Sequence, residues 1–203
     1  MSTTARVSTP ARATSVGLAL TFDDGPDPRG TPALLDALSE VGARATFFVI
    51  APNAQRHPDL VGRAAEEGHR VELHCDRHVR HTDLDEAEVR RDTERALQRL
   101  DRLGIAPTLW RVPWGVQTPA SERIAAEFGL TLIGWDVDTH DWRGDNAEAM
   151  FEATLPQLSD GAVVLAHDGI GPGARRESCA ATVAYARLVA AHAAAAHVDL
   201  RAL

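Results

Sequence analysis

Short apolar runs rich in valine, isoleucine, leucine and phenylalanine alternate along this chain with longer segments of helical periodicity. This alternation is typical of parallel strands joined by covering helices, because such strands are buried on both faces. We predict seven strands, at residues 16–22, 45–50, 70–73, 108–112, 131–137, 162–166 and 198–200. Six helices are expected between them, at residues 31–41, 58–67, 86–103, 120–128, 147–158 and 179–196.

Four glycines support these helix ends, because Gly42, Gly68, Gly104 and Gly129 follow predicted helices where a left-handed cap is favoured. We expect an α/β protein of one domain, residues 16–203, preceded by a flexible N-terminal segment, residues 1–15. Seven strands fall short of the eight of a regular barrel, so a deformed (β/α)7 barrel is the first choice. A doubly wound open sheet is the alternative, but no GxGxxG or GxxxxGK turn follows the first strand.

Charge and composition exclude several classes of function. The 29 acidic side chains outweigh the 21 basic ones, and the formal charge of −8 would repel nucleic acid and anionic membranes. No lysine occurs, which excludes Schiff-base chemistry and a phosphate-binding Walker lysine. The polar N-terminus has no signal-peptide core and no apolar stretch is long enough to span a membrane, so a cytoplasmic protein is expected unless a native export signal was removed.

Polar side chains follow five of the predicted strands. In either α/β architecture the carboxyl ends of the strands carry the reactive groups. The segments there are TFDDGP at residues 21–26, HCDRH at 74–78, RVPWG at 111–115, DVDTHDW at 136–142 and LAHD at 165–168. We therefore expect the active site at this edge of the sheet, beside a glycine-rich loop at residues 168–178.

The adjacent carboxylates of Asp23 and Asp24 would repel each other unless a cation neutralised them. His74 and His78 are four residues apart, so on a helical turn both imidazoles would lie on one face and could share a metal with one of the aspartates. Two histidines and a carboxylate suit catalytic zinc and also ferrous iron, and zinc is the better choice for hydrolysis. Each motif alone has an ordinary explanation, since HxxxH occurs often by chance and Asp-Asp-Gly-Pro is a common turn.

The order of the five motifs resembles that of the polysaccharide deacetylases, the carbohydrate esterases with NodB homology, or family 4, which include chitooligosaccharide deacetylases. The resemblance implies a deformed barrel of seven strands and a metal-dependent hydrolase that removes N-acetyl groups from amino sugars. It further implies that Asp24, His74 and His78 bind the metal, that Asp23 is the general base, and that Arg111 keeps Asp23 ionised. Zn²⁺ is the expected ion, with Co²⁺ or Mn²⁺ as alternatives.

The resemblance also assigns the remaining site residues. It makes His167 the general acid and pairs it with Asp138, whose negative charge would keep the imidazole protonated. The backbone amide of Trp114 would polarise the substrate carbonyl, while Trp142 and Leu165 would line the pocket for the acyl methyl group. Aromatic residues make up only 5% of the chain, which favours a short substrate such as an N-acetylated amino sugar or a chitooligosaccharide.

The second motif departs from the family pattern on both sides of its first histidine. Cys75 follows that histidine where serine or threonine is usual, and Leu73 precedes it where asparagine is frequent. Cys75 could compete as a soft metal ligand, and His81 adds a third imidazole after His78. Trp110 and Trp135 lie in apolar runs and are expected in the core. The alternatives to a sugar deacetylase are an amidase acting on a non-sugar acyl amide, a deacetylase of peptidoglycan or another wall polymer, and a metal-containing glycan-binding domain without catalysis.

Overall fold

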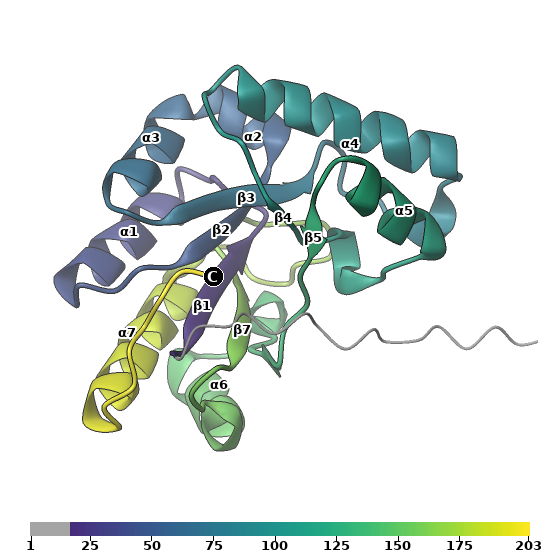
Figure 1. The fold of residues 1–203 in the computed structure, drawn as a ribbon. Coiled ribbons are helices and arrows are strands. Elements are labelled where there is room, and N and C mark those ends of the chain that lie inside the picture. Colours follow the sequence, from purple (N-terminus) through teal and green to yellow (C-terminus); the bar gives the residue numbers. More distant parts are fainter. Residues whose placement is uncertain (1–16) are drawn as a thin grey trace, which may run out of the picture.

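Seven parallel strands form one curled sheet in the computed structural model, which describes residues 17–203. The expected flexible segment at 1–15 and Val16 lie outside the described residues. The order across the sheet is β5-β4-β3-β2-β1-β7-β6, so β1 lies near its centre (Figure 1). The strands are β1 (Ala19–Asp23), β2 (Thr46–Ile50), β3 (Arg70–Cys75), β4 (Leu109–Trp110), β5 (Thr131–Leu132), β6 (Val137–Asp138) and β7 (Val163–His167).

Helices surround the sheet and cover its outer face (Figure 1). They are α1 (Thr31–Glu40), α2 (Ala51–Arg56), α3 (Pro58–Glu66), α4 (Glu86–Asp101), α5 (Pro119–Glu127), α6 (Ala147–Thr154) and α7 (Ala180–Ala195). Four short 3-10 turns complete the structure: η1 (His81–Asp83), η2 (Pro113–Gly115), η3 (Asp141–Arg143) and η4 (Leu155–Gln157). Of the helices within residues 17–203, none combines the length and apolar character needed to cross a membrane.

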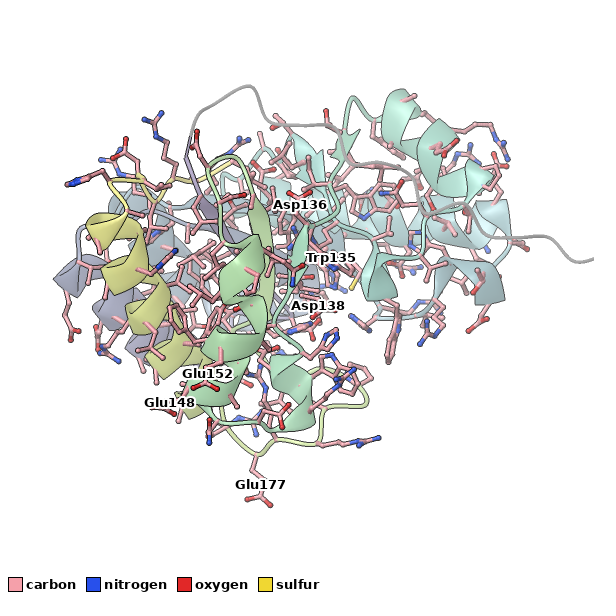
Figure 2. The ribbon with its side chains drawn as sticks, turned by 90° about the horizontal axis from the view of Figure 1, so that it is seen from below. Trp135, Asp136, Asp138, Glu148, Glu152 and Glu177 are labelled. Atoms are coloured by element: carbon pink, nitrogen blue, oxygen red, sulfur yellow. The ribbon has the colours of Figure 1, made fainter. Side chains whose placement is uncertain are left out.

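The predicted strand at 131–137 is two strands in the structure. β5 pairs with β4 at one edge of the sheet, whereas β6 pairs with β7 at the opposite edge. Residues 133–136 therefore cross between the edges, and we call them the crossing segment. Figure 2 shows its residues Trp135 and Asp136, with Asp138 beyond them, in the middle of the molecule. The sequence did not reveal this break, because Ile133 and Val137 are both buried although only Val137 belongs to a strand.

Two other elements differ from the sequence prediction. The expected last strand at 198–200 is reduced to a single bridge between Leu18 and Leu200. Helix α2 was not predicted, because it spans six residues and contains Pro52, which is tolerated in the first turn of a helix. The count of seven strands is confirmed, although its membership changed.

Local sequence signals explain the remaining elements. All five residues of β1 are buried, as expected for a strand covered on both faces. Helix α4 begins with a capping box, in which Asp85 and Glu88 each accept a hydrogen bond from the other's backbone N–H. The four predicted glycine caps are confirmed, since Gly42, Gly68, Gly104 and Gly129 all have φ between +64° and +83°.

The register of the central strands brings their carboxyl ends together. In the pairing of β1 with β7, Asp23 lies opposite His167. β3 extends two residues beyond its predicted end, so that His74 is part of the strand. The sequence motifs therefore meet at one edge of the sheet, as the α/β pattern predicts.

Candidate active site

Three potential metal ligands converge at the carboxyl ends of β1 and β3. Oδ1 of Asp24 lies 3.4 Å from Nε2 of His74 and 3.3 Å from Nε2 of His78. Ligand atoms of all three residues lie within 4.8 Å of one another. Two ligands of a tetrahedral zinc ion, with bonds of about 2.0–2.2 Å, are separated by about 3.3–3.6 Å. The spacing of these atoms therefore fits a divalent ion.

The surroundings of the three ligands also fit a cation. Oδ1 of Asp24 is buried and has no hydrogen-bond partner among residues 17–203, an arrangement that is costly without a positive charge beside it. Nδ1 of His74 lies 2.6 Å from the carbonyl oxygen of Arg111. If Nδ1 donates this hydrogen bond, Nε2 presents its lone pair to a metal, as in other histidine metal sites.

The protonation equilibria of the ligands are strongly perturbed. Burial raises the pKa of Asp24, but His74, His167 and His78 outweigh it and lower that pKa to about 2. Burial and the charge of His74 lower the pKa of His78 to about 4. Burial lowers the pKa of His74, but the negative charges of Asp23 and Asp24 outweigh burial and raise that pKa above its ordinary value. A metal would replace the proton that these carboxylates favour on His74, so metal binding should release a proton.

A bend, rather than the expected helical turn, connects His74 to His78. Asp92 of α4 holds this bend, because its carboxylate accepts hydrogen bonds from the backbone N–H groups of Asp76 (3.0 Å) and Arg77 (3.2 Å). The side chain of Asp76 in turn pairs with arginines 95 and 99 of the same helix. The buried Asp92 was missed in the sequence, where it is one of several acids on an amphipathic helix.

The two other residues that had raised the question of additional ligands lie outside the donor set. His81 is buried, and its Nδ1 lies 2.8 Å from the hydroxyl of Ser121. Cys75 is buried and is not among the clustered ligand atoms. The structure therefore brings together the three residues predicted to bind the metal, and no fourth potential ligand among residues 17–203 joins this cluster.

Asp23 and Arg111 form a buried ion pair beside the metal ligands. Nη1 of Arg111 donates to Oδ1 of Asp23 at 3.0 Å and to the hydroxyl of Thr21 at 2.6 Å. Nη2 donates to the carbonyl oxygen of Gly134 in the crossing segment at 2.9 Å. Arg111 is fully buried, and these hydrogen bonds fix its guanidinium against the carboxylate of Asp23. The predicted contact between these two residues is present.

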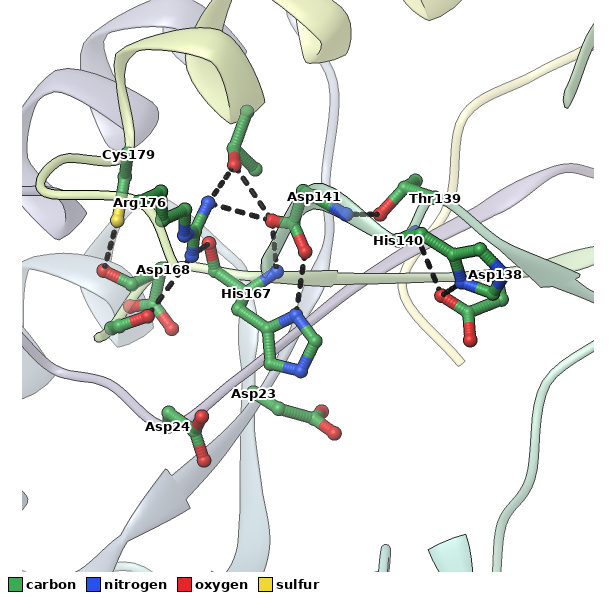
Figure 3. A network of polar contacts seen from close by, with 12 residues as sticks. Asp23, Asp24, Asp138, Thr139, His140, Asp141, His167, Asp168, Arg176 and Cys179 are labelled. Atoms are coloured by element: carbon green, nitrogen blue, oxygen red, sulfur yellow. Dashed lines mark hydrogen bonds and ion pairs between the residues drawn. The ribbon is translucent and has the colours of Figure 1, made fainter. Parts of the chain in front are cut away.

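The predicted pairing of His167 with Asp138 is wrong. Nδ1 of His167 lies 2.7 Å from Oδ1 of Asp141, whereas Asp138 lies 2.7 Å from Nδ1 of His140 (Figure 3). Asp138 lies beside β7, opposite Leu165, but its side chain contacts His140. His140 adopts a left-handed conformation with φ of 51°, and the chain after this turn places the carboxylate of Asp141 beside His167. The DTHDW motif contains both aspartates, and their spacing alone could not decide between them.

Asp141 is the centre of a buried polar network. Its Oδ2 accepts hydrogen bonds from the backbone N–H of His167, from Nη1 of Arg176 and from the hydroxyl of Thr182. Burial alone would lower the pKa of His167, but Asp141, assisted by Asp23 and Asp24, raises it to about 9. Figure 3 shows the imidazole pointing from Asp141 toward Asp23 and Asp24. Its Nε2 is therefore placed to exchange protons with a group bound there.

A cavity of about 300 Å³ opens between these groups. Its walls include all three predicted pocket residues, Trp114, Trp142 and Leu165, together with the loop at 168–178. Trp135 also lines the cavity, so the expectation that it belongs to the core is wrong, whereas Trp110 is buried as predicted. A Cβ atom on Gly171 of the loop would lie 1.9 Å from Oδ2 of Asp24, so only glycine allows the loop to approach this closely.

Comparisons with known proteins agree with this geometry. Residues 12–133 match the model of the family described as polysaccharide deacetylase. The chain belongs to the polysaccharide deacetylase family. It is 36% identical to a chitooligosaccharide deacetylase of Bradyrhizobium over 80% of this chain and 75% of the relative. It is 40% identical to a peptidoglycan-N-acetylglucosamine deacetylase of Listeria monocytogenes over 78% of this chain, which is only 34% of that relative's length.

A solved structure supports the fold assignment of this polysaccharide deacetylase family member. The family 4 carbohydrate esterase from Streptomyces lividans, solved in complex with acetate, superposes with a TM-score of 0.81. The two proteins are 32% identical, and the match covers 92% of each chain. The expected deformed barrel of seven parallel strands is confirmed.

Proposed function

We propose that this protein hydrolyses the N-acetyl amide of N-acetylglucosamine residues in a glycan and releases acetate. The observation that carries the proposal is that a candidate general base and a candidate general acid line the same cavity. Asp23 is held by a buried arginine, and His167 is held protonated by Asp141. The three clustered ligands lie between them in sequence and line the same cavity. Amide hydrolysis needs both a base and an acid.

Asp24, His74 and His78 would hold the divalent ion, for which zinc is the best candidate. A divalent ion held there supplies Lewis acidity and stabilises the negative charge that develops on the amide oxygen.

The residues of the chain account for the proton transfers. Asp23 removes a proton from the attacking water, whose oxygen forms a bond with the carbonyl carbon. His167 donates its proton from Nε2 to the amide nitrogen while the carbon–nitrogen bond breaks. The products are acetate and a free amino sugar, and a later proton transfer from Asp23 to His167 through solvent restores both groups.

The cavity suits one sugar residue with its acetyl group. Its volume of about 300 Å³ is at the lower end of ligand pockets. Leu165 and Trp142 provide an apolar surface for the acetyl methyl group, and the backbone amide of Trp114 is assigned to the carbonyl oxygen. Relatives named for chitooligosaccharides and for peptidoglycan both match the chain, so both classes of N-acetylglucosamine glycan are substrates to test.

Acetate release from N-acetylated chitooligosaccharides and from peptidoglycan glycan fragments tests the proposal directly. We expect release with zinc or cobalt present and loss of activity after chelation. Asp23→Asn should keep the metal and lose about 10²- to 10⁴-fold in kcat, because general base catalysis contributes that much. Activity only on non-sugar acyl amides, or a wild-type kcat in Asp23→Asn, would contradict it.

A further inference from the structure

One wall of the cavity consists of a cation stacked on an aromatic ring. Cζ of Arg80 lies 4.0 Å from the centroid of a Trp114 ring, and both residues line the cavity. The ring of His78 packs edge-on against the same tryptophan, with centroids 5.3 Å apart. Arg80 is therefore separated from the reacting groups by one aromatic ring.

The charge of Arg80 is not used by the protein within residues 17–203. No described carboxylate lies within 4.0 Å of its guanidinium. Arg176, the other arginine that lines the cavity, is paired with Asp141. A guanidinium stacked on an aromatic face keeps its N–H groups in its own plane, where they can donate to a planar anion. Arg80 is thus a half-buried donor that is held in place and faces the cavity.

The size of the cavity determines which part of a substrate reaches Arg80. About 300 Å³ accommodates one sugar residue, so the residues attached to it must lie at the rim. Trp114 is 39% exposed and forms part of that rim together with Arg80. A neighbouring sugar that leaves the cavity on this side would pass over this wall.

We infer that Arg80, stacked on Trp114, binds a carboxylate on the sugar next to the one that is deacetylated. The inference rests on the proposed function and refines it. It assigns as preferred substrate a glycan in which N-acetylglucosamine adjoins a sugar acid, such as N-acetylmuramic acid with a free lactyl carboxylate. A carboxylate matches the fork of a guanidinium through paired hydrogen bonds, whereas the neutral residues of a chitooligosaccharide offer no such partner.

The test compares two substrates of equal length, a neutral N-acetylglucosamine oligomer and a fragment with alternating N-acetylglucosamine and N-acetylmuramic acid. The ratio of kcat/KM for the acidic substrate to that for the neutral one is measured. We expect Arg80→Gln to lower this ratio about fivefold, mainly through KM, which corresponds to a partly exposed ion pair. Arg80→Lys, which keeps the charge but loses the fork, should give an intermediate ratio.

Two controls separate the possible outcomes. Arg187→Gln on α7 removes the same charge from an exposed ion pair with Glu40 of α1, and it should leave the ratio unchanged. For the wild type, raising the ionic strength from about 0.01 M to about 1 M shortens the Debye length about tenfold and should lower the ratio. An Arg80→Gln ratio equal to that of the wild type, or a salt-independent ratio, would overturn the inference. Failure of the wild type to release acetate from either substrate would instead overturn the proposed function.

Discussion

The protonation of His167 depends on one carboxylate that also accepts hydrogen bonds from two other side chains. Asp141 accepts hydrogen bonds from Arg176 and Thr182 on one oxygen and holds Nδ1 of His167 with the other. The hydrogen bond from Arg176 fixes the orientation of Asp141. Burial raises the pKa of the Asp141 carboxyl, but His167 and Arg176 outweigh it and lower that pKa. The imidazole therefore has a well-oriented partner whose lowered pKa favours its ionised form, which suits a group that must carry a proton in neutral solution.

Asp141→Asn should move the alkaline limb of the activity profile to lower pH. The pKa of His167 is raised to about 9, so the active imidazolium is lost as the pH rises through that value. Removal of the charge of Asp141 lowers this pKa, and a shift of about 1–2 pH units is expected. The pH dependence of kcat measures it, with Asp138→Asn as the matched control, because Asp138 contacts His140 instead. A larger shift in the control than in Asp141→Asn would contradict this assignment.

Asp168 should make the stability of the protein depend on pH. Burial raises its pKa to about 7, although Thr31 and the backbone N–H of Gly25 donate hydrogen bonds to it. Its stabilising contribution is therefore complete below pH 3.8, the ordinary value, and is lost as the pH rises toward 7 and above. In Asp168→Asn the melting temperature should fall less between pH 5 and pH 8 than in the wild type. Equal falls in both proteins would show that Asp168 does not titrate in this range.

At the scale of elements, the metal ligands depend on a helix that contributes none of them. Helix α4 packs beside β3 and directs Asp92 into the bend between His74 and His78. Without this carboxylate, two backbone N–H groups of the bend would lose their acceptor. The position of His78 relative to β3 is therefore set by a contact 15 residues or more away along the chain.

Asp92→Ala should weaken binding of zinc about 10- to 100-fold, the usual cost of losing a residue that supports a metal ligand. Asp92→Asn, which keeps one acceptor oxygen, should lie between this variant and the wild type. Competition with a chromophoric chelator measures the affinity independently of activity. Glu40→Ala, on the surface of α1, is the control and should bind zinc as the wild type does. Unchanged affinity in a folded Asp92→Ala protein would show that the bend holds its own shape.

At the scale of the whole molecule, the sequence predicted the features that depend on local pattern. It did not predict which strands pair with each other or which side chain pairs with His167. Buried strands, glycine caps and the order of the motifs placed Asp23, His74 and His167 at one edge correctly. The crossing segment was missed, because apolar residues such as Ile133 and Trp135 are as typical of a strand as of a segment that crosses between two strands. The partner of His167 was missed for a related reason, since a left-handed residue at position 140 redirects the chain.

Arg111 connects distant parts of the molecule, because it joins β4 to Asp23 of β1 and to the crossing segment. Arg111→Met should lower the free energy of unfolding by about 3–5 kcal/mol, since it leaves Asp23 buried without its partner. The added substitution Asp23→Asn should recover part of the loss, which urea denaturation can measure. Arg187→Met, which breaks an exposed pair, should change the free energy of unfolding far less than Arg111→Met does. If the double variant were no more stable than Arg111→Met, the uncompensated charge would not be the cause.

The unequal lengths of the strands have a consequence for how the protein loses order on warming. β1, β2, β3 and β7 have five or six residues each, whereas β4, β5 and β6 have two. Amide hydrogens of the short strands should exchange with solvent sooner, because strands with few cross-strand hydrogen bonds open at a lower cost in free energy. Trp135 lies between the short strands β5 and β6, whereas Asp23 and His167 are the last residues of the long strands β1 and β7. Substrate binding should therefore deteriorate at temperatures where the base and the acid still face each other.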